Sequence, residues 1–239
     1  MSLDIKKNDR ILIVAPHPDD ETIGCGGLML KYGEQCEILL LTDGRKGYNS
    51  DIKTDEDALV ETRANELSSA ASLAGVKRLH MLGICDGTLK DHANQVVTFD
   101  LTPYDYIFVP NHYERHKDHA PVLKIIQKAC HKQRSDAALY EYEVWSPIPD
   151  PTDILNLDEL IERKLAMIHE YQSQIRYLDY ETMTEALNRY RGVGQKMKYA
   201  EVYAFVPRMT LLKRIKKVFP RCLKLWIRES AGKWSTNNP

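Results

Sequence analysis

Four ionisable side chains follow directly on the first apolar run of this chain. Residues 11–14 are apolar and mostly β-branched, and Pro16 follows them, a pattern typical of a buried strand. Residues 17–21 then contain one histidine and three carboxylates. Burying such groups without partners costs several kcal/mol each, so they need water, a partner or a metal ion. Since open α/β sheets bind ligands at the carboxyl ends of their strands, this stretch predicts a functional site on an α/β fold.

A second ionisable cluster lies about a hundred residues later, in residues 111–119. It also follows a strand-like run, at residues 106–110, and it contains His116 and His119. If a helix begins here, these two side chains lie on one face, because residues three apart are neighbours on a helix. Two histidines, one carboxylate and an open position form a set typical of catalytic zinc. The spacing alone leaves open which aspartate completes it.

The rest of the chain alternates strand-like and helical segments, which favours a Rossmann-like, mostly parallel sheet with helices on both faces. We predict strands at 10–15, 36–41, 78–82, 106–109, 137–145 and 201–206. We predict helices at 24–32, 55–74, 118–133, 157–174 and 181–198, while 83–102 fits a loop with a short helix. The expected domain covers residues 1–207, and a basic helical extension covers 208–239.

Composition excludes several classes of protein. The chain of 239 residues has 33 Lys and Arg against 34 Asp and Glu, so no bulk charge favours nucleic acid. Its five cysteines form no Cys-x-x-Cys pair, which favours free thiols in a reducing compartment. The first residues lack the apolar core of a signal peptide, and no apolar stretch is long enough for a spanning helix. The cytoplasm is the expected location.

The C-terminal extension carries most of the charge asymmetry. From Arg208 to Pro239 there are nine basic residues and one acidic residue. Apolar residues recur there at helical spacing: Leu211, Ile215, Val218, Cys222 and Leu225. Two interpretations stay open. Terminal helices could cap the domain through this apolar face, or residues 208–228 could lie on an anionic membrane surface, where each basic residue contributes roughly 1 kcal/mol.

Co-sedimentation with anionic liposomes separates these interpretations. Peripheral membrane binding predicts that the full chain sediments with the vesicles and that a chain ending at Pro207 does not. Equal, negligible binding of both forms contradicts the membrane interpretation, and a truncated chain that fails to fold favours capping.

Two other classes of enzyme fit the sequence poorly. The glycines after the first strand and Asp43 after the second suggest dinucleotide binding, hence an oxidoreductase. That fingerprint needs Gly-x-Gly-x-x-Gly directly after the strand, whereas the pair Gly24-x-Gly26 begins nine residues after Ala15 and Met29 occupies the third glycine position. The charged loop would also repel a pyrophosphate. A serine hydrolase is excluded because the chain has no Gly-x-Ser-x-Gly motif.

The two ionisable clusters together resemble the PIG-L/LmbE-type zinc deacetylases. The resemblance rests on residues 15–21 and on the downstream His-x-x-His, and it spans most of the first 207 residues. Weaker family motifs lie at residues 42–44, at Arg63 with Glu66, at 173–174 and at 200–201. Pro16 and the basic extension depart from the family pattern. Members remove the acetyl group from N-acetylglucosamine units in small or lipid-linked glycosides.

The resemblance also implies roles for individual residues. The metal ligands would be His17, Asp20 and His119, and the cofactor would be zinc. Asp19 resembles the general base, His116 the residue that stabilises the oxyanion or protonates the leaving amine, and Asp118 the carboxylate that orients His116. The expected substrate-binding residues are His112, Asp43 and Arg63, although His112 could equally cap a loop.

We therefore expect a zinc-dependent N-deacetylase that acts on an N-acetylglucosamine-type glycoside, with a lipid or a nucleotide among the candidate aglycones. Amide hydrolysis at neutral pH needs an activated water and a stabilised oxyanion, which a zinc set with a neighbouring base supplies. The alternative is a non-catalytic sugar-binding protein on the same fold. Asp19 and His116 speak against that alternative, because a binding module needs no base. The aglycone, the choice of divalent metal and the oligomeric state stay open at this point.

Overall fold

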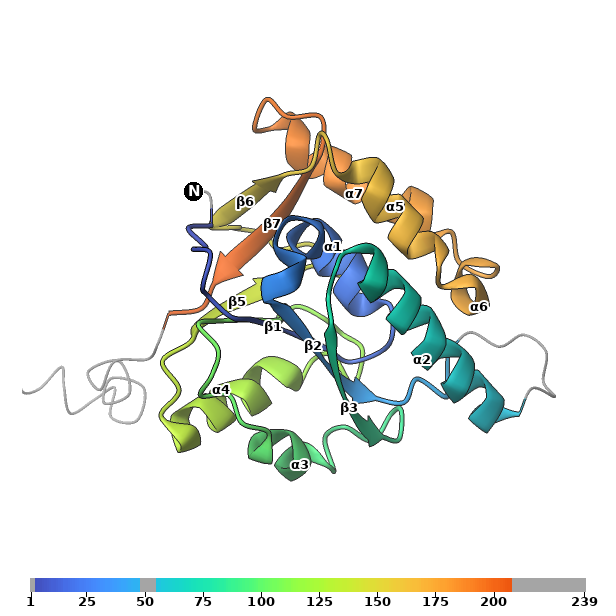
Figure 1. Ribbon diagram of the computed structural model, residues 1–239, viewed down its shortest axis with the longest axis vertical. Helices are drawn as coiled ribbons and strands as arrows, with labels where there is room; N and C mark the ends of the chain where they lie inside the picture. Colours follow the sequence, from blue (N-terminus) through green and yellow to red (C-terminus); the bar gives the residue numbers. More distant parts are fainter. Residues whose placement is uncertain (1–2, 48–54, 208–239) are drawn as a thin grey trace, which may run out of the picture. The chain divides into compact units, whose positions relative to one another are not determined.

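The computed structural model describes residues 3–47 and 55–207, and the chain divides into two units after Val206. The first unit is built on a seven-stranded sheet with the order β3-β2-β1-β4-β5-β7-β6 (Figure 1). The strands are β1 (Ile11–Ala15), β2 (Cys36–Thr42), β3 (Arg78–Ile84), β4 (Tyr106–Pro110), β5 (Ala138–Tyr142), β6 (Asp153–Asn156) and β7 (Ala200–Phe205). The helices are α1 (Asp20–Tyr32), α2 (Glu56–Leu73), α3 (Ala93–Thr98), α4 (Val122–Gln133), α5 (Ile161–His169), α6 (Gln172–Ile175) and α7 (Tyr180–Val193), with a short 3₁₀ turn at Gly33–Gln35.

The strand order places a crevice at the end of β1. The first five strands are parallel, and β7 runs antiparallel to both β5 and β6. β1 lies between β2 and β4, so the chain leaves it on one side and returns on the other. Such a switch point opens a crevice at the carboxyl ends of the two diverging strands, where α/β proteins bind ligands. The two ionisable clusters follow β1 and β4 and therefore meet there.

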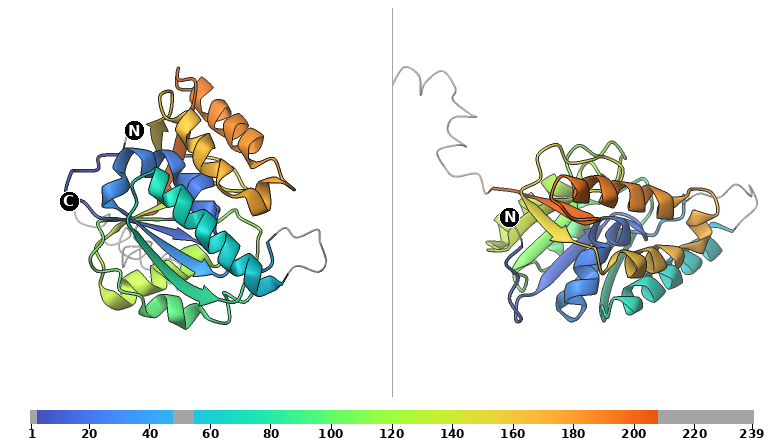
Figure 2. Two further views of the ribbon diagram at one scale, coloured as in Figure 1. Left: turned by 45° about the vertical axis from the view of Figure 1, so that its right-hand side comes forward. Right: turned by 90° about the horizontal axis from the view of Figure 1, so that it is seen from above.

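Helices cover both faces of the sheet, as the sequence predicts. Alternate residues of β1 point to opposite faces, so Ile13 and Leu12 belong to two different apolar cores. The first core takes in the inner faces of α1, α2 and α5, and the second takes in α3 and α4. Figure 1 shows α3 and α4 together on one face, and Figure 2 shows α2, α5 and α7 on the other.

Several predicted boundaries are wrong. α1 begins at Asp20, within the ionisable cluster, and kinks at Cys25. α4 begins only at Val122, because Pro121 disfavours helical backbone in the residue before it. The single helix predicted at 157–174 is two helices, with a break where the buried Tyr171 turns its hydroxyl toward Glu21. The sequence does not predict β6, since its four residues carry little apolar signal.

A buried ion pair joins α1, α5 and β7. Lys164 on α5 and Glu201 on β7 are both almost fully buried, and their Nζ and Oε1 atoms lie 2.7 Å apart. Lys164 also donates to the carbonyl oxygen of Ile23, at 2.8 Å, and Glu201 accepts from the N–H of Gly27, at 2.6 Å. A side chain at Gly26 would lie 2.8 Å from Lys164 Cγ, so this glycine lets α1 approach α5 closely. The pair therefore fixes the helix that begins in the ionisable cluster.

Replacing Lys164 with methionine is expected to lower the free energy of unfolding by about 3–5 kcal/mol, because it leaves the Glu201 carboxylate buried without its cation. Urea denaturation measures the change. Lys132→Met on the exposed face of α4 is the control, with an expected change within about 0.5 kcal/mol. Equal urea denaturation midpoints for the two variants would show that the ion pair makes no net contribution to the free energy of unfolding.

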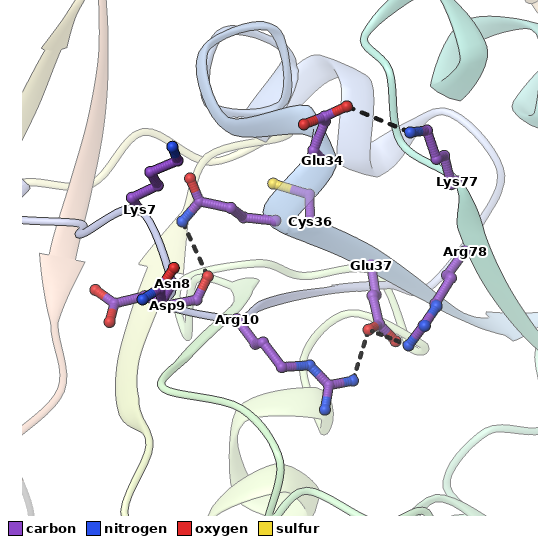
Figure 3. Close-up of a pocket in the computed structure, with 10 residues that line it drawn as sticks. Lys7, Asn8, Asp9, Arg10, Glu34, Cys36, Glu37, Lys77 and Arg78 are labelled. Atoms are coloured by element: carbon purple, nitrogen blue, oxygen red, sulfur yellow. Dashed lines mark hydrogen bonds and ion pairs between the residues drawn. The ribbon is translucent and has the colours of Figure 1, made fainter.

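A second charged network lies at the opposite, amino-terminal end of the strands, where it lines a surface pocket (Figure 3). Glu37 on β2 accepts from Arg10, at 2.7 Å, and from the Tyr104 hydroxyl, at 2.8 Å, and it lies 2.8 Å from His80 Nε2. Burial raises the pKa of Glu37, but the hydrogen bonds from His80, Arg10 and Tyr104 outweigh it and lower the pKa to about 2.

The Glu37 contribution to stability is expected to vanish in acid. A carboxylate whose pKa falls on folding stabilises the protein above its unfolded pKa, and this stabilisation disappears as pH falls through the folded value. Wild type should therefore exceed Glu37→Gln by up to about 3 kcal/mol in unfolding free energy above pH ~4.5, with the difference shrinking toward pH ~2. Chelated samples exclude metal release from the measurement. Glu34→Gln, in the exposed pair with Lys77, is the control and should show no such pH dependence.

Among the described residues, no helix is long and apolar enough to cross a membrane. The predicted extension 208–239 lies outside the described residues. The helical character of the extension and its membrane binding therefore stay predictions.

Candidate metal centre and active site

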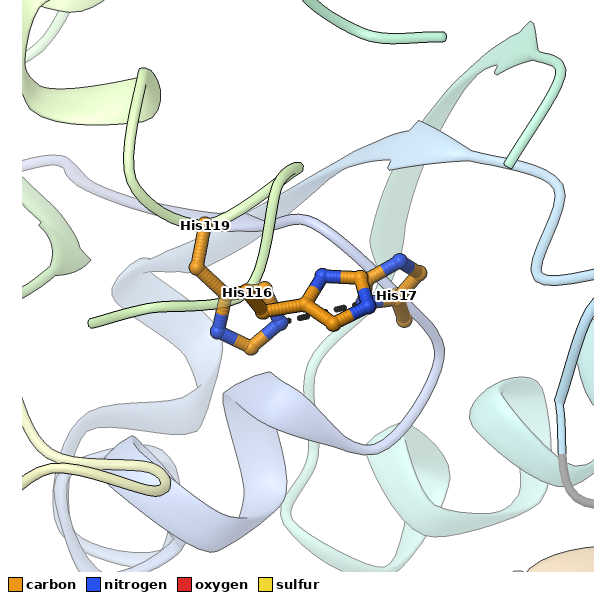
Figure 4. Close-up of side chains that lie close together, drawn as sticks. All are labelled: His17, His116 and His119. Atoms are coloured by element: carbon orange, nitrogen blue, oxygen red, sulfur yellow. Dashed lines mark hydrogen bonds between the residues drawn. The ribbon is translucent and has the colours of Figure 1, made fainter. Parts of the chain in front are cut away.

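His17, Asp20 and His119 converge at the crevice between β1 and β4. His17 Nδ1 lies 3.1 Å from His119 Nε2, and Asp20 Oδ2 lies 3.3 Å from the first of these nitrogens and 3.1 Å from the second. Figure 4 shows the two rings pointing toward each other from the loops that follow the two strands. All three residues are buried. The structure thus brings the three predicted metal ligands together.

The triangle formed by His17 Nδ1, Asp20 Oδ2 and His119 Nε2 fits a zinc ion. Ligand nitrogens about 2.0–2.1 Å from tetrahedral zinc lie about 3.3 Å from one another, close to the separations observed. Two wider groups, each with ligand atoms within 4.8 Å, also include His17: one with His116 and His119, and one with Asp86 and Asp118. The carboxylates of the second group accept backbone N–H donors, from Lys46 to Asp86 and from Gly87 to Asp118, which fixes them in the surrounding loops.

The charge around the triangle is negative. Burial lowers the pKa of His119, but the Asp20 carboxylate outweighs it and raises this pKa to about 9. Burial opposes ionisation of Asp20 as well, yet His119 and His17 lower its pKa. Four carboxylates, those of Asp20, Asp86, Glu114 and Asp118, lie within 3.6 Å of a nitrogen of His17 or His119. Such surroundings favour a bound cation, whether as protons on the rings or as a metal ion.

Asp19 has an unusual backbone conformation, and its carboxylate is not part of the triangle. Its φ of 134° lies in a region that non-glycine residues rarely adopt, at a cost of about 1–3 kcal/mol. It precedes α1, but its carboxylate makes no cap hydrogen bond to the helix. The carboxylate instead accepts from Arg63 Nη2, at 3.0 Å. Burial, together with the charges of Asp20 and Glu21, raises the pKa of Asp19 to about 7, against the lowering effect of Arg63.

Arg63 holds this loop from α2. Its side chain is buried, and it donates to the carbonyl oxygens of Pro18, at 2.7 Å, and Gly44, at 2.8 Å, besides Asp19. The sequence predicts Arg63 as a substrate-binding residue. These contacts place it beside Asp19 as a support of the loop, and substrate binding by Arg63 stays a prediction.

His116 and Asp118 lie beside the triangle in a turn that precedes α4. The His116 ring packs edge-on against His17, with centroids 4.8 Å apart, and burial lowers its pKa together with the charges of His17 and His119. The family resemblance predicts that the Asp118 carboxylate orients His116. In the structure this carboxylate instead lies 3.4 Å from His17 Nε2, and the contact with His116 Nδ1 comes from the Asp118 N–H, at 3.3 Å.

Asp43 and His112 contact residues outside the triangle. Asp43 accepts from Arg45 and from the N–H of Asp86, so it supports the loop after β3. The His112 side chain is half exposed, and its Nδ1 lies 2.8 Å from Glu141 on β5. Their predicted contact with substrate stays a prediction.

Sequence reasoning misses two carboxylates, Asp86 and Glu114. Asp86 follows the end of β3 by two residues, which is the same strand-end position as the ionisable clusters. A carboxylate at the end of a parallel strand indicates a residue of the site, and the prediction of a loop with a short helix over 83–102 overlooks this indication. Glu114 lies within the second cluster itself, between the end of β4 and the two histidines predicted to matter.

Comparisons with known proteins agree with this arrangement. The family model described as GlcNAc-PI de-N-acetylase, PIG-L, matches residues 12–130. A diacetylchitobiose deacetylase from Thermococcus kodakarensis is 28% identical, over 85% of this chain and 84% of the relative.

Among solved structures, the N,N'-diacetylchitobiose deacetylase from Pyrococcus horikoshii has a TM-score of 0.73 at 22% identity, covering 83% of this chain and 84% of that one. A 4-carboxy-2-hydroxymuconate hydratase from Pseudomonas putida has a TM-score of 0.71 at 20% identity, covering 84% and 98%. The fold alone therefore does not fix the reaction. The family match, the deacetylase relative and the ionisable clusters of the sequence agree, and the chain belongs to the PIG-L/LmbE deacetylase family.

Proposed function

We propose that this protein is a zinc-dependent hydrolase that removes the N-acetyl group from an N-acetylglucosamine-type amino sugar. The observation that carries the proposal is the buried triangle of His17 Nδ1, Asp20 Oδ2 and His119 Nε2, with separations of 3.1–3.3 Å. These residues would hold the zinc ion. When bound, zinc polarises the amide carbonyl and lowers the pKa of water to about 7.

Asp19 is the general base in this proposal. It adjoins the ligand Asp20, but its carboxylate faces Arg63 instead of joining the triangle, so it is available to take a proton from the attacking water. Arg63 keeps it in place through its contacts with two carbonyl oxygens, that of Pro18 in the same loop and that of Gly44 after β2. Removing a positioned base typically costs about 10²–10⁴ in rate.

His116 is the proton donor in this proposal. Its ring adjoins both ligand histidines, with centroids 4.8 Å from His17 and 4.9 Å from His119. In its imidazolium form, the ring donates an N–H to the oxyanion. When the amide C–N bond breaks, this proton passes to the leaving amine and the ring becomes neutral imidazole. A donor of this kind is typically worth about 10²–10³ in rate.

Acetate release from a panel of N-acetylated sugars tests the proposal. The panel contains N-acetylglucosamine, diacetylchitobiose and glycosides with lipid and nucleotide aglycones, each assayed with chelated protein and with zinc-reconstituted protein. The proposal expects zinc-dependent release from at least one of them. Sugar binding by zinc-loaded protein with no release across the panel contradicts it and favours the sugar-binding alternative.

A further inference from the structure

Two buried polar atoms face each other beside the triangle without a hydrogen bond. Glu114 Oε2 and His119 Nδ1 are both fully buried, and neither has a hydrogen-bond partner within residues 3–47 and 55–207. They lie 3.6 Å apart, just beyond hydrogen-bonding distance. Leaving such atoms unpaired is unfavourable, and a slight rotation of the ring would join them.

The other nitrogen of the same ring points into the triangle. His119 Nε2 lies 3.1 Å from both His17 Nδ1 and Asp20 Oδ2. A neutral histidine that binds a metal through Nε2 carries its proton on Nδ1, and the partner of that proton selects this tautomer. Glu114 is the carboxylate placed to accept it.

Glu114 is itself held in a fixed orientation. Its other oxygen, Oε1, accepts the backbone N–H groups of Trp145 and Ser146, each at 2.9 Å. Two donors on one oxygen leave Oε2 directed at His119. The segment after β5 is thereby tied to the ring that faces the metal set.

His17 has a comparable arrangement at its own outer nitrogen. Its Nε2 lies 3.4 Å from Asp118 Oδ2 and 3.5 Å from Asp86 Oδ1, while its Nδ1 belongs to the triangle. Each of the two histidines therefore has one nitrogen in the metal set and a carboxylate at the other.

We propose that Glu114 is a positioning residue that fixes the tautomer and the ring orientation of His119 for metal binding. The inference rests on the proposed metal set, and it adds a residue that neither the family resemblance nor the sequence pattern assigns. It also makes the Trp145–Ser146 backbone part of the support of the metal ligand.

Glu114→Gln is the most informative variant. It keeps the shape of the side chain and places a hydrogen-bond donor, in place of an acceptor, opposite His119 Nδ1. The two N–H donors of Trp145 and Ser146 retain the glutamine oxygen at the Oε1 position, so the amide NH₂ faces His119 Nδ1. That NH₂ can only donate, which drives the ring proton to Nε2, the atom that must bind the metal. Loss of an outer carboxylate of this kind typically weakens metal affinity by about 10–100-fold.

The experiment measures the zinc dissociation constant by competition with a chromophoric chelator, with zinc alone as the probe. We expect about 10–100-fold weaker binding for Glu114→Gln than for wild type. Glu37→Gln is the matched control, because Glu37 is also a buried carboxylate 2.8 Å from a histidine nitrogen but lies at the other end of the sheet. Its zinc affinity should equal that of wild type.

Equal zinc affinity for wild type and folded Glu114→Gln would overturn the proposal. If that variant does not fold, ¹⁵N NMR of the zinc-loaded wild type decides instead: the proposal expects a protonated Nδ1 on His119, and a protonated Nε2 would overturn it. Neither measurement uses turnover, so zinc-binding protein that releases no acetate would contradict the proposed function and leave this test intact. Wild type that binds no zinc would overturn both.

Discussion

Replacing His119 with alanine is expected to abolish zinc binding and acetate release together. His119 supplies one of the three ligand atoms of the triangle, and its removal leaves only His17 and Asp20, one ligand fewer than a catalytic zinc site typically has. Metal analysis should find about one zinc per chain in purified wild type and close to none in the variant. His131→Ala, on the exposed end of α4, is the control and should match wild type in both readouts.

The same experiment can contradict the metal mechanism. Full activity in a wild-type sample stripped by chelator, with metal analysis showing no residual zinc, would mean that hydrolysis does not need the ion. Activity retained by a metal-free His119→Ala protein would lead to the same conclusion.

Replacing Asp19 with asparagine is expected to leave zinc binding intact and to abolish most of the catalytic activity. The amide oxygen of the new side chain can still accept a hydrogen bond from Arg63, so the loop should keep its shape, but an amide cannot take up the proton of the attacking water. We expect kcat to fall by at least about 10², with one zinc per chain retained.

Asp20→Asn is the matched comparison for this variant. The Oδ2 atom of Asp20 contacts both histidines of the triangle, so the charge removed there belongs to the metal set and zinc content should fall. If Asp19→Asn instead empties the site while Asp20→Asn keeps the ion, the two aspartates have been assigned the wrong way round.

The sequence predicts the place of the site better than its inner contacts. Strand ends are visible as apolar runs that stop at polar residues, so the meeting of the two clusters follows once β1 and β4 are neighbours in a parallel sheet. Chain direction at a turn is harder to predict. The helix predicted from Asp118 begins at Val122, and the Asp118 carboxylate in the turn before it lies 3.4 Å from His17 Nε2, a contact that the sequence does not predict.

Contacts between distant segments explain the remaining misses. Glu114 is oriented by two backbone N–H groups that lie about thirty residues away in the chain, and no local sequence pattern predicts these contacts. Tyr171 ends a helix that its neighbours would continue, because its hydroxyl reaches Glu21. In both cases tertiary contacts override local preference.

The backbone of Asp19 has a consequence for any redesign of this protein. At a φ of 134° glycine is the residue with the least strain, so a procedure that optimises stability alone would choose glycine at position 19. Glycine at this position would remove the carboxylate that accepts a hydrogen bond from Arg63. A thermostable version of this protein should therefore be sought at other positions, with residue 19 excluded from the search even though it offers one of the more obvious improvements.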